Sequence, residues 1–376
     1  MKKIALIGST GSIGKQVISV SNRYPDEFKI VSLSAHSNRI EFEQQVNKLN
    51  PKVACLDICN GDITVPKGVD FYSGENSYLN AVITEADIVV VSVVGFAGLK
   101  AVLKAIDLKK DIALANKESL VVGGEIVMQK AKENGVKITP IDSEHSAIWQ
   151  ALGFDLNKEF KRIILTASGG AFRDLSKDEL FFATAKDALK HPNWNMGSKI
   201  TIDCATLVNK AFEVIEAKWL YNTTFDKIDA IIHRESIIHS MVEFNDNSVM
   251  AQLSYPTMEI PIALALNHDK RLCQNVPQLD FKALKSLTFS EIDNDKFPCF
   301  KLVVNAGKNG DAYPAVANGA NEIAVQAFLD GKIKYCDIFS IIDGALNAYT
   351  NDAPYSLDKI FLADEYSRQY AMSKIK

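Results

Sequence analysis

The first 142 residues alternate between short apolar runs and segments with helical periodicity. Helix-period segments at 40–49, 99–106 and 120–131 separate most of the apolar runs, which lie at 4–7, 30–33, 53–56, 88–94, 112–114 and 138–141. Strands that alternate with helices are typical of βαβ units, in which helices cover both faces of a parallel sheet. Residues 1–142 are therefore predicted to form an α/β domain with a Rossmann-like, doubly wound parallel sheet.

The pattern becomes mixed after residue 142. Apolar runs at 163–166 and 231–232 predict strands, 237–244 and 249–253 alternate as antiparallel strands do, and 206–220 has the period of a helix. A charged, turn-rich stretch at 269–297 suits a surface connector. Helices of a C-terminal bundle are predicted at 300–306, 320–329, 336–349 and 357–374. We expect three parts: the nucleotide-binding domain 1–142, an α+β domain at 143–285, and a connector with the helical bundle at 286–376.

The composition is that of a soluble globular protein, since 47% of the 376 residues are hydrophobic and 23% are charged. The 42 basic and 46 acidic side chains leave a net charge of −4, which argues against nucleic-acid binding through a basic surface. Lys2 and Lys3 precede an apolar run too short for a secretory signal. The longest apolar stretch, about 88–99, is shorter than the roughly 18 residues that a membrane span needs. We expect a cytoplasmic protein with six reduced cysteines.

A glycine-rich loop follows the first predicted strand. Residues 8–14 read GSTGSIG, a G-x-x-G-x-x-G spacing that differs from the commoner G-x-G-x-x-G. Glycines let a backbone approach a pyrophosphate, and the N-terminus of the next helix offers N–H groups and partial positive charge. The loop also suits a plain strand-to-helix turn, but its place after the first strand favours dinucleotide binding.

The segment after the second predicted strand indicates which dinucleotide binds. NAD enzymes usually carry an acidic residue there for the ribose 2′-hydroxyl. Residues 34–39 read SAHSNR, and no carboxylate occurs before Glu41. Hydroxyl, amide and guanidinium groups suit a 2′-phosphate, so NADPH is favoured. The alternative is a polar loop that caps the next helix.

Two carboxylates, Asp142 and Glu144, follow the sixth predicted strand, and the sequence Asn-Lys-Glu at 116–118 follows the fifth. Side chains two apart on an extended segment point the same way, so Asp142 and Glu144 are expected to converge. Converging carboxylates favour Mg²⁺ or Mn²⁺, whereas the alternative is a pair of solvated loop carboxylates.

The helix at 206–220 offers a third carboxylate. Asn209 and Glu213 are four apart on one helix face with Lys210 beside them, a set that suits a phosphate and a metal together. The alternative is an amphipathic helix with a salt-bridged face, because Glu216 and Lys218 lie nearby.

Two loops add candidate chemistry. Residues 166–170 (TASGG) follow a predicted strand and suit a second anion site. Residues 191–197 (HPNWNMG) place Trp194 and Met196 between Pro and Gly, which suits a lid that excludes water from a polar substrate. A Trp that packs beneath its own loop fits equally well. The histidines outside this loop show no metal spacing, and most are expected to be structural.

Eight motifs occur in a fixed order from residue 1 into the C-terminal bundle: 8–14 (GSTGSIG), 114–120 (LANKESL), 140–145 (PIDSEH), 166–170 (TASGG), 191–197 (HPNWNMG), 209–216 (NKAFEVIE), 237–242 (IIHSMV) and 317–324 (ANGANEIA). Together they resemble the 1-deoxy-D-xylulose 5-phosphate reductoisomerases. The resemblance implies an enzyme of the non-mevalonate route to isoprenoid precursors. Such an enzyme rearranges its substrate to an aldehyde, which NADPH reduces to 2-C-methyl-D-erythritol 4-phosphate.

The resemblance also implies roles for single residues. Asp142, Glu144 and Glu213 would bind one divalent cation, Mg²⁺ or Mn²⁺, that polarises the substrate's oxygens. Lys117 would add a positive charge near the reacting oxygens and assist proton transfer. The central domain would carry this metal site and a flap at about 186–198, which His191 would help to close.

Binding residues follow from the same resemblance. The substrate would contact Lys117, Ser143 through its backbone, Glu144, Ser168, His191, Trp194, Cys204, Asn209, Lys210 and Glu213, with its phosphate on Ser168, Asn209 and Lys210. NADPH would contact Thr10, Gly11, Ser12, Ile13, Ser37, Asn38, Asn116, Glu118 and Gly197, with Met196 beside the nicotinamide.

This chain departs from the family pattern at two places. Cys204 stands where a serine is usual that donates to the substrate phosphate, and a thiol is a weak donor, so one phosphate contact is expected to weaken. Arg234 and Glu235 replace the usual Pro-Gln before 237–242, at a place that we expect to lie outside the site.

Two other functions fit parts of the sequence. A plain NADPH-dependent dehydrogenase would share the nucleotide domain and need no metal. A non-catalytic dinucleotide sensor would tolerate substitution of Asp142 and Lys117. Because the family is homodimeric, a homodimer through the exposed central sheet is expected, with a small sugar phosphate as substrate and no nucleic-acid or membrane partner.

Overall fold

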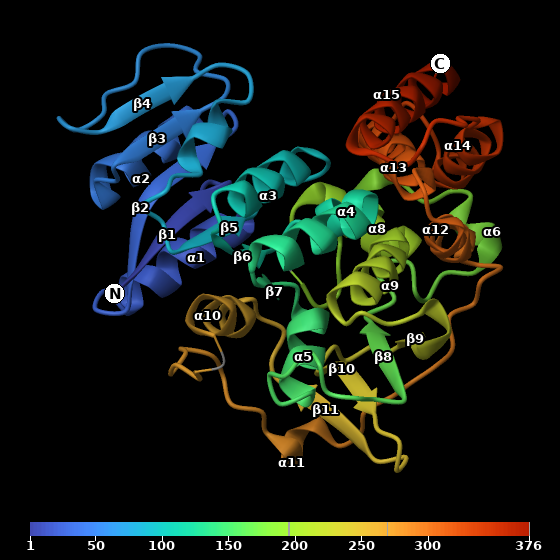
Figure 1. Ribbon diagram of the computed structural model, residues 1–376. Helices are drawn as coiled ribbons and strands as arrows, with labels where there is room; N and C mark the ends of the chain where they lie inside the picture. Colours follow the sequence, from blue (N-terminus) through green and yellow to red (C-terminus); the bar gives the residue numbers. More distant parts are fainter. Residues whose placement is uncertain (195, 269, 376) are drawn as a thin grey trace. The chain divides into compact units, whose positions relative to one another are not determined.

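The computed structural model describes residues 1–194, 196–268 and 270–375 (Figure 1). Contacts between residues divide the chain into two compact units. Unit 1 comprises Met1–Ser119, Val127–Ser146 and Thr257–Val276, and unit 2 comprises Leu120–Ile126, Ala147–Pro256 and Pro277–Lys376. The three-part division expected from the sequence remains a prediction.

Unit 1 is built on a seven-stranded parallel sheet, which confirms the predicted α/β class. The strand order is β4-β3-β2-β1-β5-β6-β7. The strands are β1 (Lys2–Ile7), β2 (Phe28–Ala35), β3 (Val53–Leu56), β4 (Asp70–Ser73), β5 (Ile88–Val91), β6 (Asp111–Leu114) and β7 (Ile138–Pro140). Because the order reverses at β1, which pairs with both β2 and β5, a crevice is expected beyond the carboxyl end of β1.

One strand, β4, was not predicted from the sequence. It lies at the edge of the sheet, and its residues DFYS are mostly exposed, so it lacks the apolar run from which a strand is predicted. The central strands, by contrast, are buried over most of their length, as expected where helices cover both faces.

The helices that belong to the parallel sheet begin near the predicted positions, except for a short 3₁₀ helix that was not predicted from the sequence. They are α1 (Ser12–Arg23), α2 (Arg39–Leu49), α3 (Ala97–Asp107) and the short 3₁₀ helix η1 (Ser77–Ala81). Two further helices contribute residues to both units: α4 (Glu118–Asn134), which departs from helical geometry at Gly123, and α5 (Ser143–Ala151).

One helix of unit 1 comes from far along the chain. α10 (Glu259–Asn267) was expected within the second region, yet it packs on α1, β6 and β7. Its side chains Ile262, Ala263, Ala265 and Leu266 join the apolar core of the parallel sheet. Arg23 of α1 reinforces the contact, because its Nη1 lies 2.7 Å from Glu259 Oε2.

Unit 2 carries a four-stranded mixed sheet in the order β11-β10-β8-β9. Its strands are β8 (Arg162–Ala167), β9 (Ile228–Ile232), β10 (Ile238–Glu243) and β11 (Val249–Leu253). β10 is antiparallel to β8 and β11, as the alternation of the sequence predicts, and β8 and β9 are parallel. The helix α9 (Val208–Leu220) packs on β8 and β9 and follows α8 (Ser198–Thr206) directly.

The C-terminal helices form the predicted bundle within unit 2 (red and orange in Figure 1). α13 (Tyr313–Leu329) contacts α12 (Pro298–Asn309), α14 (Tyr335–Ala348), α15 (Leu357–Lys374) and α8. The connector that precedes the bundle holds only the four-residue helix α11 (Phe281–Leu284) among its described residues, and Asp269 of that stretch lies outside them. Of two further short helices, α6 (Lys177–Leu180) precedes the predicted flap and α7 (Ala185–Ala188) overlaps its beginning.

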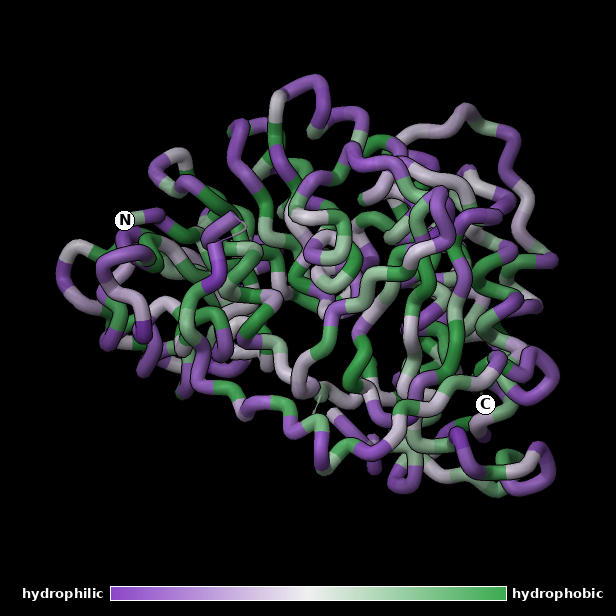
Figure 2. Tube along the Cα trace, turned by 90° about the horizontal axis from the view of Figure 1, so that it is seen from below, coloured by the Kyte–Doolittle hydropathy of each residue, from purple (hydrophilic) through white to green (hydrophobic). Residues whose placement is uncertain are grey.

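Hydrophobic residues run mainly along the packed strands and helices, while polar residues dominate many outer loops (Figure 2). Across the described residues, every helix is too short or too polar to cross a membrane.

Candidate active site

The glycine loop of unit 1 has the geometry of an anion cradle. Gly8 has φ +95°, and a Cβ built there would lie 2.8 Å from the Ser92 carbonyl oxygen. A Cβ on Gly14 would lie 2.2 Å from the Gly8 carbonyl oxygen, so a side chain at either place would push the turn open. α1 begins at Ser12 with Gly11 as its N-cap, and its first turn holds no acidic residue. Thr10 and Ile13 flank this helix start, whose N–H groups suit a pyrophosphate.

The segment after β2 confirms part of the alternative interpretation. Asn38 caps α2, because its Oδ1 accepts a hydrogen bond from the backbone N–H of Glu41 at 3.4 Å. Ser37 beside it is exposed, and the described segment 36–38 carries no acidic side chain. A helix cap and a phosphate contact are compatible, so NADPH selection by Ser37 and Asn38 stays a prediction.

Asn116 is a buried structural anchor. Its Nδ2 lies within hydrogen-bonding distance of the Val93 and Gly95 carbonyls, at 3.0 and 2.8 Å, and of Glu118 Oε2 at 2.9 Å. Its Oδ1 accepts from the Ser119 backbone at 3.0 Å. The amide therefore joins the end of β6 to the β5–α3 turn, and a cofactor contact from Asn116 would use its backbone.

A buried ion pair lies beyond the carboxyl ends of β6 and β7. Lys117 Nζ is 2.8 Å from Asp142 Oδ2, and His145 Nδ1 is 3.3 Å from Asp142 Oδ1. Burial raises the pKa of Asp142, but the charge of Lys117 and the contact with His145 outweigh it and hold the pKa well below its usual range. Asp142 is thus ionised at neutral pH. His145 was not proposed from the sequence, although its spacing of three from Asp142 places it on the same side of a helix start.

The expected reason for the convergence of Asp142 and Glu144 is wrong. Glu144 lies in the first turn of α5, not on an extended segment. Asp142 Oδ1 accepts from the Glu144 backbone N–H at 3.2 Å, as a helix-capping aspartate does. The Ser143 hydroxyl donates to Glu144 Oε2 at 2.5 Å, and the helix N-terminus favours both carboxylates.

Unit 2 contributes a second buried charged group on α9. Asn209 Nδ2 donates to Glu213 Oε1 at 2.5 Å, and Lys210 Nζ pairs with Glu213 Oε2. The Lys210 and Glu213 side chains are only 4% and 1% exposed. This burial excludes the solvated salt-bridged face that the sequence left open, and buried charge of this kind is typical of functional sites.

Ser168 is oriented to donate a hydrogen bond. His191 Nδ1 accepts from the backbone N–H groups of Trp194 at 2.9 Å and Asn193 at 3.2 Å, so the imidazole proton belongs on Nε2. Ser168 Oγ, 3.0 Å from that Nε2, accepts its proton and also accepts from Gly170 N–H at 3.2 Å. The serine's own proton is then available to an anionic oxygen. Burial, followed by the charge of Arg173, lowers the pKa of His191 to about 4.

The flap residues are held by unit 2 itself. The Trp194 ring packs edge-on against His239 of β10, with centroids 5.9 Å apart. Met196 is partly buried, Gly197 is the N-cap of α8, and Asn195 lies outside the described residues. Contrary to expectation, the 234–235 segment contacts these loops, because Asn193 Nδ2 lies 3.4 Å from the Glu235 carbonyl oxygen.

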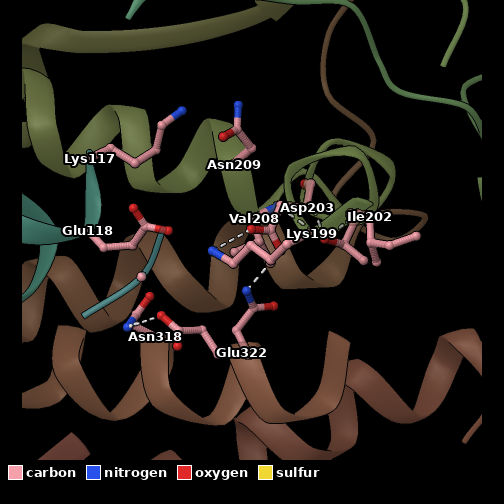
Figure 3. A network of polar contacts seen from close by, with 12 residues as sticks. Lys117, Glu118, Lys199, Ile202, Asp203, Val208, Asn209, Asn318 and Glu322 are labelled. Atoms are coloured by element: carbon pink, nitrogen blue, oxygen red, sulfur yellow. Dashed lines mark hydrogen bonds and ion pairs between the residues drawn. The ribbon is translucent and has the colours of Figure 1, made fainter. Parts of the chain in front are cut away.

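α8, which carries Cys204, is fixed to its neighbours by a polar network (Figure 3). Asp203 is buried, with Lys199 Nζ at 2.8 Å and the Nδ2 of Asn321, from α13, at 2.9 Å. The Ser168 loop rests directly on this helix, since a Cβ on Gly170 would lie 2.4 Å from the Cys204 carbonyl oxygen. The network was not proposed from the sequence, because no local pattern links Asp203 to Asn321.

Known proteins match this chain along its whole length. The 1-deoxy-D-xylulose 5-phosphate reductoisomerase family model matches residues 4–124, and two C-terminal domain models of that family match 138–221 and 253–370. Curated 1-deoxy-D-xylulose 5-phosphate reductoisomerases from Chloroherpeton thalassium and Bacillus cereus are 45% and 47% identical, over 100% and 99% of this chain and 98% of each relative.

Solved structures of the same name are also similar. The Zymomonas mobilis enzyme in complex with NADPH has a TM-score of 0.89 at 37% identity and covers 99% of this chain and 98% of its own. A DOX-P reductoisomerase in complex with NADPH, fosmidomycin and magnesium has a TM-score of 0.93 at 35% identity and covers 100% and 98%.

We expect the His191 imidazole to stay neutral from pH 7 to about 5 and to protonate only near pH 4. In the unfolded chain it takes up a proton near pH 6.5. The wild type should therefore lose stability relative to His191→Gln as the pH falls from about 6.5 towards 4. Nitrogen NMR of labelled histidine, assigned with the variant, measures the pKa, and a titration near 6.5 would contradict the burial argument.

Proposed function

The chain belongs to the 1-deoxy-D-xylulose 5-phosphate reductoisomerase family, and we propose how its residues perform the reaction. The enzyme isomerises 1-deoxy-D-xylulose 5-phosphate in a metal-dependent step and reduces the product with NADPH, in the non-mevalonate route to isoprenoid precursors. The observation that carries the residue assignment is the ion pair of Lys117 with Asp142. Both groups are charged and almost fully buried at the sheet edge where α/β proteins bind ligands.

The cofactor assignment rests on the loop before α1. When bound, NADPH supplies the hydride and its pyrophosphate needs unpaired N–H donors. Ser12 is exposed in the first turn of a helix start without acidic residues, which fits that need. We assign NADPH contacts to Thr10, Gly11, Ser12, Ile13, Ser37, Asn38, Asn116, Glu118 and Gly197.

We assign the divalent cation to Asp142, Glu144 and Glu213. Oxygen ligands suit Mg²⁺ or Mn²⁺, and the DOX-P reductoisomerase relatives were solved with magnesium. When bound, the cation acts as a Lewis acid on the substrate's oxygens. Lys117 keeps Asp142 ionised, which a metal ligand requires, and supplies positive charge of its own.

The substrate phosphate is assigned to residues of unit 2. Ser168 presents a hydroxyl proton, Lys210 a buried ammonium and Asn209 an amide, and these are the donors that a phosphate needs. Cys204 lies on the helix beneath the Ser168 loop and adds a weaker donor. We assign a backbone contact to Ser143. Binding at this remote group orients the reacting end, while His191, Trp194 and Met196 exclude water.

A homodimer in the cytoplasm is proposed as the working form. β11 is an edge strand whose Val249 and Met250 are 48% and 54% exposed, and such an apolar edge is usually covered. A second copy of the chain is the occupant that the family implies. None of the six cysteines, all of them described, forms a disulfide, as is usual in the reducing cytosol.

We expect Asp142→Asn and Lys117→Ala to lower kcat/KM by roughly 10³-fold or more, because each removes charge from the reacting centre. NADPH oxidation with 1-deoxy-D-xylulose 5-phosphate measures this, with the cation present, chelated and restored. NADPH binding, followed by fluorescence, should be largely retained. Asp246→Asn, on an exposed turn, is the matched control.

Metal-independent turnover would contradict the proposal and favour a plain dehydrogenase. Unchanged function in Asp142→Asn and Lys117→Ala would favour a dinucleotide sensor.

Cys204→Ser should improve substrate affinity, because a hydroxyl donates to phosphate better than a thiol. We expect the KM for the substrate to fall by roughly 2- to 10-fold, with the KM for NADPH unchanged. Cys336→Ser, an exposed cysteine on α14, is the control. An unchanged KM in Cys204→Ser would mean that Cys204 does not contact the phosphate.

The dimer should appear as twice the chain mass in light or X-ray scattering, and Met250→Asp should shift it towards monomer by placing charge in the apolar edge. Ile40→Asp, at a position of unit 1 that is 67% exposed, is a control for the added charge. A monodisperse wild-type monomer would refute the proposed interface.

A further inference from the structure

Arg173 lies in a tightly fixed turn just after the Ser168 loop. Phe172 before it is buried and packs edge-on against Tyr335, with ring centroids 5.0 Å apart. The Tyr335 hydroxyl in turn donates to the Ala205 carbonyl of α8 at 2.8 Å. A Cβ on Gly169 would lie 2.8 Å from the Cβ of Arg173, so only a glycine at this position allows Arg173 to lie this close to the Ser168 loop.

One guanidinium nitrogen of Arg173 reaches three oxygens. Nη1 lies 3.1 Å from the Ser168 carbonyl, 3.2 Å from Asn193 Oδ1 and 2.9 Å from the Arg234 carbonyl. These oxygens belong to the loop after β8, to the flap and to the turn after β9, segments that are far apart in sequence. The two hydrogens of Nη1 are shared among three acceptors, so the contacts depend on the orientation of a planar guanidinium.

Asn193 connects Arg173 to the rest of the flap. Its Oδ1 accepts from Arg173 while its Nδ2 faces the Glu235 carbonyl at 3.4 Å, so both ends of the amide are held. The backbone N–H of the same residue donates to His191 Nδ1. Arg173 is therefore joined to the His191 ring through Asn193, and to the Ser168 main chain directly.

We propose that Arg173 is a positioning residue that aligns the flap histidine His191 with the Ser168 hydroxyl and thereby sets the strength of the substrate phosphate contact. Arg173 acts through Asn193 and the Ser168 carbonyl and touches neither substrate nor cofactor. The inference deepens the proposed function and rests on its assignment of Ser168 to the phosphate.

The geometry explains why arginine is required here. A lysine ammonium would place a point charge at one spot and would satisfy one or two of the three oxygens. The partly buried carbonyl of Ser168 or the Asn193 amide would then lose its partner, and the imidazole would lose its single orientation. Arg234, whose side chain instead pairs with Asp174 at 2.7 Å, contributes only its carbonyl to this arrangement.

The test compares Arg173→Lys and Asn193→Ala with the control Arg234→Gln, which removes a neighbouring charge and keeps the Arg234 carbonyl. We expect Arg173→Lys to raise the KM for 1-deoxy-D-xylulose 5-phosphate roughly 10- to 100-fold while the Kd for NADPH changes less than about twofold. Nitrogen NMR of the substrate-free protein should show one Nε2–H tautomer of His191 in the wild type and the control, and a mixture in both test variants.

A wild-type KM together with a single tautomer in Arg173→Lys would overturn the inference. If that variant does not fold, as judged from its Tm, the result for Asn193→Ala tests the inference by itself. This variant removes the hydrogen bond between Arg173 and Asn193 by changing the flap residue. The tautomer measurement needs no substrate. A wild-type protein that fails to turn over 1-deoxy-D-xylulose 5-phosphate therefore refutes the proposed function, while a mixed tautomer in the variants still supports the alignment of His191.

Discussion

Charge that is buried in protein must be neutralised by a partner, and this constraint applies in both units. Lys117 and Asp142 form one such pair in unit 1, and Lys210 and Glu213 form another in unit 2. Loss of one partner from a buried pair costs about 3–5 kcal/mol, because the other charge stays buried and uncompensated. Each pair thus holds a carboxylate and an ammonium ionised, ready to be matched by a cation or an anion from a ligand.

Close backbone approach is the second requirement, and glycine meets it in both units. Gly14 lets α1 begin against the Gly8 carbonyl, and Gly170 lets the Ser168 loop rest on α8. A side chain at either place would push apart the two backbone segments that meet there. The loops are therefore shaped by contacts made before any ligand binds, which lowers the entropy that binding has to overcome.

Local patterns could be predicted from the sequence, and contacts between distant segments could not. Buried strands such as β1 and β5 can be recognised in the sequence as apolar runs, whereas β4 is an exposed edge strand without such a run. The return of α10 to the first sheet depends on an apolar face whose partners lie more than 100 residues away in sequence. Asp142 and Glu144 were expected to converge on an extended segment, and this reason is wrong because Asp142 caps α5. Nothing near Arg173 in the sequence indicates that it meets Asn193 and Arg234.

The net charge of −4 means that attraction for two anionic ligands has to be local. Exposed charges more than about 8 Å apart are largely screened at physiological ionic strength, so a small negative net charge causes little long-range repulsion. In the proposed assignment, the start of α1, the ammonium of Lys210 and the Ser168 hydroxyl are the local donors for the anionic groups. His191 is neutral, so it donates a hydrogen bond through Nε2 without placing an unpaired charge in partly buried surroundings.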